Sequence, residues 1–267
     1  MSTPTAAPIT DSPLARRNPS VKLALVTAVS MVAVFVLDPA TPAVLYLLAL
    51  VGVAGSTRAP ARTLVLAHAP FVAFAVGLLV VNALSRPGAE LWDAGPVRIT
   101  EEGLSVGAAL AARTLLIGVL AIGFMLSTDG VALMTSLHQN LRLGPRVTYA
   151  ILAGYRMLQE MPREWRSIRH AHSVRQDEVD ATRVPRGPRH LAAVVFTLLV
   201  VSIRRGERMA QALESRGLGL RPRSTWRPVP VTAADAVLVV VVLGTVALVL
   251  VTSAWLGTLQ GPGALMR

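Results

Sequence analysis

The chain has 267 residues, of which 53% are hydrophobic and only 15% are charged, and its mean hydropathy is +0.55. Soluble domains are closer to a quarter charged, so this composition predicts an all-α, polytopic membrane protein. The net charge of +11 could suggest a nucleic-acid partner. Aromatic residues, whose rings stack on bases, make up only 4% of the chain, and we therefore expect no nucleic-acid partner.

Two residue types that often carry chemistry are scarce. The chain has no cysteine, which excludes disulfides, thiolate catalysis and cysteine-ligated metal sites. Lys22 is the only lysine, and it follows Val21, whereas the lysine of an ATP-binding phosphate loop follows a glycine. We therefore expect that the chain is not an ATPase and that it holds no cofactor.

The first 127 residues are predicted to form a polar tail and four membrane spans. Residues 1–20 are rich in Pro, Ser, Thr and Ala and are expected to be a disordered cytoplasmic tail. A helix needs about 20 apolar residues to cross the ~30 Å hydrocarbon layer. Residues 21–127 supply four apolar blocks, of which the first two are slightly short, and a polar loop at 85–103. These blocks are 21–37, 42–55, 63–84 and 104–126.

The rest of the chain is an arginine-rich segment, 128–231, followed by a fifth span. The fifth span is predicted at 232–258 and a short external tail at 259–267. Within the segment we expect a short helix from Asp129 and two long amphipathic helices joined by a polar linker. The long helices are expected at 145–175, with a kink at Pro162, and at 188–216.

The second long helix begins with an apolar stretch, 191–203, of about 13 residues. This length is short for a membrane span. We therefore expect the stretch to be buried beneath the membrane part of the chain.

Loop charges predict the orientation in the membrane. The loop at 85–103 is acidic on balance, while the tail, the link after the second block and the segment 128–231 are basic. Because basic loops stay in the cytoplasm, we expect the N-terminus and the segment 128–231 there and the C-terminus outside. The basic residues before the third block are Arg16, Arg17, Lys22, Arg58 and Arg62.

Three polar side chains lie inside apolar blocks. An arginine at the centre of a membrane costs about 2.5–3.5 kcal/mol on insertion scales, so Arg113 should face protein or water. A snorkelling or intramolecular hydrogen bond is favoured for Arg113 over a contact with a partner protein. His68 and Asn82 are expected to form hydrogen bonds between helices.

Two short arginine motifs lie at the ends of the two long helices. They are Ser173-Val174-Arg175-Gln176 and Glu214-Ser215-Arg216-Gly217, and their arginines are 41 residues apart. A basic residue at a helix C-terminus can simply favour the helix dipole, by ~0.3–1 kcal/mol. The repeated arrangement favours a second interpretation, in which each guanidinium binds carboxylate or carbonyl oxygens of a soluble partner.

Nearly the whole chain resembles the T component of energy-coupling factor (ECF) transporters, the transmembrane coupling subunit of vitamin and metal importers. Besides the two arginine motifs, the resemblance rests on Asn18-Pro19, Lys22-Leu23, Ile99-Thr100-Glu101-Glu102-Gly103-Leu104, Leu141-Arg142-Leu143-Gly144-Pro145-Arg146, Tyr155-Arg156 and Pro162.

This resemblance implies a non-catalytic subunit of the bacterial plasma membrane, with 128–231 as its coupling-helix domain. It implies two ABC-type ATPase subunits, each taking one arginine motif in a groove, and a separate S-type membrane protein that binds the substrate. Arg175 corresponds to the arginine of the first motif and Arg216 to that of the second. Their neighbours Val174, Gln176, Ser215 and Gly217 complete the expected docking residues, although Val174 and Gln176 depart from the family's Ala-Arg-Gly pattern.

Two alternatives stay open on the residues alone. A stand-alone secondary transporter would need ion-coupling acidic residues inside its spans, and Asp38 and Asp235 lie only at span edges. A membrane enzyme could use a metal at His170 and His172. A spacing of two residues, however, does not bring both histidines to one face of a helix, so no metal site is predicted.

Overall fold

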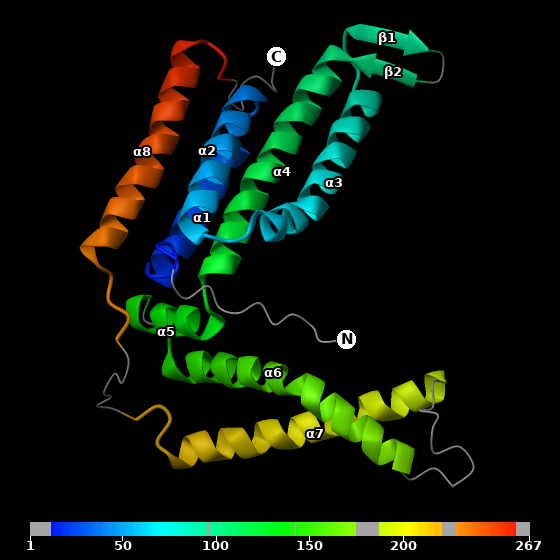
Figure 1. The fold of residues 1–267 in the computed structure, drawn as a ribbon, viewed down its shortest axis with the longest axis vertical. Helices are drawn as coiled ribbons and strands as arrows, with labels where there is room; N and C mark the ends of the chain where they lie inside the picture. Colours follow the sequence, from blue (N-terminus) through cyan, green and yellow to red (C-terminus); the bar gives the residue numbers. More distant parts are fainter. Residues whose placement is uncertain (1–11, 95–96, 142, 175–186, 221–227, 260–267) are drawn as a thin grey trace. The chain divides into compact units, whose positions relative to one another are not determined.

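The computed structural model describes residues 12–94, 97–141, 143–174, 187–220 and 228–259 (Figure 1). The chain folds as two compact units. The first, here the membrane unit, consists of residues 1–129 and 230–267, and the second, here the helical unit, of residues 130–229.

In its described residues, the membrane unit contains five helices and one short hairpin. Four of the helices are long and apolar enough to cross a membrane, while α1 is apolar but has only 16 residues. Together they confirm the predicted fold class, an all-α polytopic membrane protein. The helices are α1 (Pro19–Val34), α2 (Ala40–Thr57), α3 (Ala61–Ser85), α4 (Glu101–Ser127) and α8 (Ala233–Trp255).

Capping residues in the sequence define where three of these helices begin. Asn18 precedes α1, and its side chain accepts a hydrogen bond from the Ser20 amide at 2.9 Å. Thr100 caps α4 in the same way, accepting from the Gly103 amide at 3.2 Å. Thr232 and Asp235 form a reciprocal capping box at the start of α8. Such caps satisfy backbone N–H groups that the first helical turn leaves without partners.

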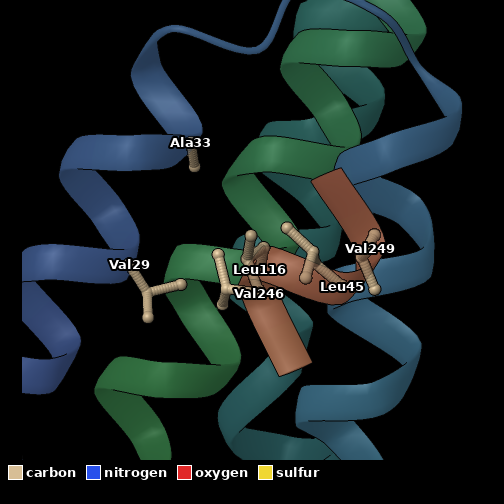
Figure 2. Close-up of a cluster of buried hydrophobic side chains, with 6 residues drawn as sticks. All are labelled: Val29, Ala33, Leu45, Leu116, Val246 and Val249. Carbon is tan, nitrogen blue, oxygen red and sulfur yellow. The ribbon is translucent and has the colours of Figure 1, made fainter. Parts of the chain in front are cut away.

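Small residues on α4 allow the neighbouring helices to approach closely. A Cβ atom added to Gly107 would lie 2.9 Å from the carbonyl oxygen of Leu79 in α3, and one added to Gly118 would lie 2.6 Å from the ring of Phe71. Close packing through small residues is the usual basis of helix association in membranes. On another side of α4, a buried cluster joins four helices (Figure 2). It consists of Val29, Ala33, Leu45, Leu116, Val246 and Val249.

The polar loop predicted at 85–103 contains a two-stranded antiparallel hairpin. Strand β1 (Glu90–Ala94) pairs with β2 (Val97–Thr100), with Glu90 opposite Thr100. The Thr100 hydroxyl donates to the carbonyl oxygen of Arg86 at 2.9 Å, and the Ala89 amide donates to the Glu102 carboxylate at 2.7 Å. These bonds fix the hairpin between α3 and α4.

The tail predicted to be disordered at 1–20 is ordered from residue 12 onwards, so the prediction is wrong for residues 12–20. Ser12 is buried, and its hydroxyl accepts a hydrogen bond from the Ala15 amide at 3.0 Å. The Leu14 amide donates to the carbonyl oxygen of Ser56 at the end of α2, at 3.4 Å. Local turns and this bond give an otherwise polar stretch a defined place. Residues 1–11 lie outside the described part of the chain.

The polar residues inside the spans form bonds within the membrane unit. Arg113 donates from Nη2 to the carbonyl oxygen of Val36 at 2.6 Å, which confirms the predicted intramolecular bond. His68 and Asn82 instead bond to carbonyl oxygens one turn earlier in their own helix, at 3.0 and 2.8 Å. The prediction that they link two helices is therefore wrong. The nearest acceptor for a polar side chain within a helix is the carbonyl four residues back.

The first turn of α1 holds the ends of two other helices of the membrane unit. Lys22 is buried and donates from Nζ to the carbonyl oxygen of Ser127, the last residue of α4, at 2.7 Å. The Asn18 amide donates to the buried Asp235 carboxylate of α8 at 2.9 Å, and its side chain donates to the Pro230 carbonyl at 3.3 Å. These residues, here the polar node, connect the points where the chain leaves and re-enters the membrane unit.

The helical unit consists of α5 (Gly130–Asn140), α6 (Pro145–Val174) and α7 (Pro188–Ser215). Helices α6 and α7 cross one another (Figure 1). Pro162 lies inside α6, which continues to Val174. In the stretch 191–203 of α7, Val194 is buried and Phe196 is 67% exposed. The expected burial of this stretch beneath the membrane part of the chain stays a prediction.

The polar node yields a prediction for stability. Replacing Asp235 with alanine removes the acceptor of the Asn18 and Thr232 amides and of the Thr232 hydroxyl. Hydrogen bonds to a charged group contribute about 1.5–3 kcal/mol, so we expect the midpoint of thermal unfolding in detergent to fall clearly. Glu101→Ala is the matched control, since Glu101 is an exposed acid in the first turn of α4. Equal midpoints for the two variants would contradict the role assigned to the node.

Candidate functional site

The crossing of α6 and α7 is marked by an ion pair. Glu164 Oε1 lies 2.9 Å from Arg205 Nη1, and both side chains are partly exposed. Met157 and Met161 of α6 and Val201 of α7 surround this point. A partly exposed pair adds at most ~1 kcal/mol. The ion pair matters here because it marks a point where the two helices meet.

The two helices run in opposite directions through this point. Beyond the ion pair, His172 of α6 lies next to residues earlier in α7. Its Nε2 is 3.3 Å from the Thr197 hydroxyl, and its ring packs edge-on against that of His190 with centroids 5.6 Å apart. The C-terminal ends of α6 and α7 therefore lie on opposite sides of the crossing.

The two ends are also equally far from the crossing. Val174 is ten residues beyond Glu164, and Ser215 is ten residues beyond Arg205. At ~1.5 Å per residue, each helix extends about 15 Å past the ion pair. The two arginine motifs thus follow two arms of equal length that point in opposite directions.

The end of α7 shows how the sequence presents the second motif. Gly217 adopts a positive φ of +78°. Its amide donates to the Glu214 carbonyl at 2.9 Å, and the Leu218 amide donates to the Leu213 carbonyl at 3.0 Å. This pair of bonds is the Schellman motif, in which a glycine ends the helix. It leaves Arg216 as the C-cap residue, with an exposed side chain.

The side chains beside Gly217 differ in their contacts. The Ser215 hydroxyl donates to the Ala212 carbonyl within α7 at 3.1 Å. The guanidinium of Arg216 has no hydrogen bond or ion pair with any residue that the structure describes. Of the two, Arg216 is therefore the side chain whose donors remain available to a partner.

The first motif is described only up to Val174, the last residue of α6. Arg175 and Gln176, like the linker predicted after them up to residue 186, lie outside the described residues. The helices that lead to the two motifs therefore end on opposite sides of the crossing. The role of Arg175 itself stays a prediction.

Sequence reasoning missed a set of contacts at α5. Gln139 accepts a hydrogen bond from the Val229 amide at 2.7 Å, and Asn140 donates to the Val229 carbonyl at 3.5 Å. The end of the helical unit is thereby held against its first helix. The turn after Arg216 also contacts the start of α6, because a Cβ on Gly219 would lie 3.4 Å from Nε of Arg146. The sequence signal for these contacts was the pair of adjacent amide side chains, Gln139 and Asn140, at the end of the short helix α5.

Histidines in the helical unit make local contacts. In the described part of the chain, no group of three or more His, Asp or Glu residues is placed to hold a metal ion. His138 contacts the Leu143 carbonyl oxygen at 2.6 Å, and His172 contacts Thr197 and His190 as above.

Apolar spans and a separate pair of crossing helices define the class of protein as an all-α polytopic membrane protein. Residues 10–226 match the family model CbiQ, described as cobalt transport protein. The chain therefore belongs to this family, the transmembrane components of energy-coupling factor transporters, and the resemblance found in the sequence is confirmed.

Three relatives extend this finding. The chain is 28% identical to an energy-coupling factor transporter transmembrane protein EcfT of Heliobacterium modesticaldum, covering 90% of this chain and 92% of that one. It is 24% identical to the protein of the same name from Thermosediminibacter oceani, over 84% and 88% of the two chains. It is also 25% identical to a putative ABC transporter ATP-binding protein of Bifidobacterium longum, over 85% of this chain but 30% of that longer protein.

The helix end at Gly217 gives a second prediction. Gly217→Ala should strain the chain, because a left-handed conformation costs an L-residue about 1–2 kcal/mol and the new Cβ would lie 3.0 Å from Leu220. Gly206→Ala, inside α7 and with nothing within 4 Å of its Cβ position, should instead stabilise the helix by up to ~1 kcal/mol. Thermal unfolding of both variants measures the contrast. A stabilised Gly217→Ala would show that the glycine is not needed to end the helix.

Proposed function

We propose that the chain is the non-catalytic coupling subunit of an ATP-driven importer. It transmits motions of two ABC-type ATPase subunits to a separate, S-type membrane protein that binds the substrate. The observation that carries the proposal is the crossing of α6 and α7, with arms of about 15 Å on either side of the Glu164–Arg205 pair. One arm presents Arg216, and the other leads to Arg175.

Each arginine is suited to a groove on an ATPase subunit. A guanidinium offers a planar fork of donors that can bind carboxylate or carbonyl oxygens in pairs. Arg216 is exposed at the very end of α7, and Gly217 ends the helix so that the backbone turns away after it. Ser215 and Gly217 flank the second docking point, and Val174 and Gln176 flank the first.

Because the two arms point in opposite directions, a change in the distance between the two ATPase subunits would change how α6 and α7 cross. When two ATPase subunits close on ATP, the two docked helix ends move towards each other, and the antiparallel helices must change their crossing angle. A helix is stiff enough to carry such a motion over ~15 Å. The support for an ATPase partner is the Bifidobacterium longum relative, where a stretch similar to this chain lies within a protein named as ATP-binding.

The same proposal places the chain in the bacterial plasma membrane, with the shorter apolar helix α1 spanning the membrane in addition to α2, α3, α4 and α8. The basic residues of the first turns and links, including Lys22, Arg58 and Arg62, favour a cytoplasmic N-terminus and cytoplasmic crossing helices. The substrate is a vitamin or a transition-metal ion recognised by the S-type partner. The family description, cobalt transport protein, favours the metal ion.

A third prediction concerns hydrolysis. The purified chain, free of other proteins, should hydrolyse no ATP, because it has no phosphate-loop lysine. Steady-state phosphate release measured on the chain alone and on the complex with its ATPase subunits tests this. Turnover that follows the isolated chain through purification would defeat the proposal of a non-catalytic subunit.

A fourth prediction concerns the two arginines. Arg216→Ala and Arg175→Ala should each weaken the assembly, since truncating a buried, charge-assisted contact costs about 2–5 kcal/mol. The double variant should lose coupled uptake while its membrane unit stays folded. Arg216→Lys should not restore uptake, because an ammonium lacks the planar fork.

The matched control is Arg166→Ala. Arg166 is an exposed arginine on α6 whose Nε donates to the Pro162 carbonyl within the helix at 3.1 Å, and its removal should leave uptake unchanged. The measurements are substrate uptake and the amount of ATPase subunit that co-purifies. Normal uptake and co-purification by the double alanine variant would reduce the two motifs to ordinary helix ends.

A further inference from the structure

An apolar crevice lies among α1, α2, α4 and α8 of the membrane unit. Its volume is about 310 Å³. Four residues of the buried cluster drawn in Figure 2, Val29, Leu45, Leu116 and Val246, line one end of it. Nothing in the coupling mechanism uses this space.

The other end of the crevice carries a cationic side chain. Lys22 lines it there, together with Leu14 and Ser56. The Lys22 ammonium donates to the carbonyl and hydroxyl oxygens of Ser127, at 2.7 and 3.3 Å, and both partners are uncharged. No carboxylate lies within 4 Å of it in the described part of the chain. An ammonium group has three donors, so a buried cation here can still accept an anionic partner.

The nearby carboxylate is already engaged. Both oxygens of Asp235 accept hydrogen bonds, one from the Asn18 amide and the other from the amide and hydroxyl of Thr232. Asp235 therefore makes its direct bonds at the start of α8, and its charge attracts the Lys22 ammonium without contacting it.

The length of the crevice matches one leaflet of a bilayer. The residues of α2 that line it run from Leu45 to Ser56, a rise of about 16 Å along a helix. Half of the ~30 Å hydrocarbon layer is about 15 Å. Lys22 lies in the first turn of α1, next to the last residue of α4. The cation is therefore at the level where the spans end, which is the level of lipid headgroups.

The crevice is open at its side but closed at its ends. Leu48 of α2 and Val241 of α8 both line it, and they are 46% and 58% exposed. At one end, the Thr41 hydroxyl of α2 donates to that of Ser253 in α8 at 2.8 Å, and at the other the Asn18–Asp235 bond holds α8 to α1. A helix, about 10 Å across, would have to break these bonds, whereas a hydrocarbon chain would not.

From these observations, we propose that the crevice binds an anionic glycerophospholipid, with an acyl chain among α1, α2, α4 and α8 and its phosphate facing Lys22. This lipid site is independent of the ATPase contacts. Its consequence is that lipid in the crevice adds to the protein contacts that hold α8 to the rest of the membrane unit.

Gly52 offers a clean way to fill the crevice. It lines the space, and a Cβ added to it would meet nothing within 4 Å, so Gly52→Leu is expected to place a side chain in that space. Gly77→Leu is the matched control, an exposed glycine within α3 that also has nothing within 4 Å and does not line the crevice. Both variants replace a helical glycine of a span by the same residue.

The experiment uses the full chain in detergent with added phosphatidylglycerol or phosphatidylcholine of identical acyl chains. Native mass spectrometry and thermal unfolding report bound lipid and its effect on stability. The wild type and Gly77→Leu should retain a single phosphatidylglycerol and be stabilised by it more than by phosphatidylcholine. Gly52→Leu should lose the bound lipid and the added stabilisation.

The headgroup is tested separately at Lys22. Lys22→Arg should keep the preference for phosphatidylglycerol, and Lys22→Met should lose it. Should Lys22→Met fail to fold, the Gly52 comparison still decides. Equal lipid retention by Gly52→Leu and Gly77→Leu, or equal effects of the two lipids on the wild type, would overturn the proposal. A dimer of the chain that Gly52→Leu abolishes, in place of a lipid adduct, would likewise overturn it.

Discussion

The structure depends on one constraint: apolar helices in a bilayer need polar contacts to hold their ends together where they leave it. In this chain the first turn of α1 supplies these contacts. Lys22 holds the end of α4 through Ser127, and Asn18 holds the start of α8 through Asp235 and Pro230. Those are the two places where the chain leaves and re-enters the membrane unit, because everything between them belongs to the helical unit. A motion of the crossing helices would reach the membrane unit through these two covalent connections.

Within the helical unit, the crossing helices likewise depend on a few specific polar contacts. A single ion pair, Glu164–Arg205, marks the crossing, and two arms of equal length extend from it. The Schellman turn at Gly217 ends one arm so that Arg216 lies at its tip. At α5, Gln139 and Asn140 hold Val229, the last residue of the unit. The unit thus has its last residue held at α5 and an exposed arginine at the tip of α7, which suits a part that is moved by partners.

The sequence predicted those features that physics imposes over short distances. Membrane spans require long apolar runs, so the predicted spans ending at 37, 55, 84, 126 and 258 became helices within a few residues of their expected bounds. The second long helix, expected at 188–216, ends at Ser215 with Arg216 as its C-cap residue. Pairings between distant residues were missed. Asn18 and Asp235 are 217 residues apart, and the β1–β2 hairpin depends on pairing that the polar composition of its loop does not reveal. His68 and Asn82 were misassigned because a bond within the helix competes with one between helices.

The central claim is that the two helix ends contact two different ATPase subunits, and crosslinking tests it most directly. The chain has no cysteine, so single cysteines at Val174 and Ser215 can each carry a photoreactive crosslinker in the assembled complex, with Glu207→Cys, near the crossing, as the control. We predict that each end crosslinks to one ATPase subunit, that the double variant yields a product of one chain with two ATPase subunits, and that the control yields neither. Crosslinking of both ends to the same subunit, or of neither end in an intact complex, would contradict the account.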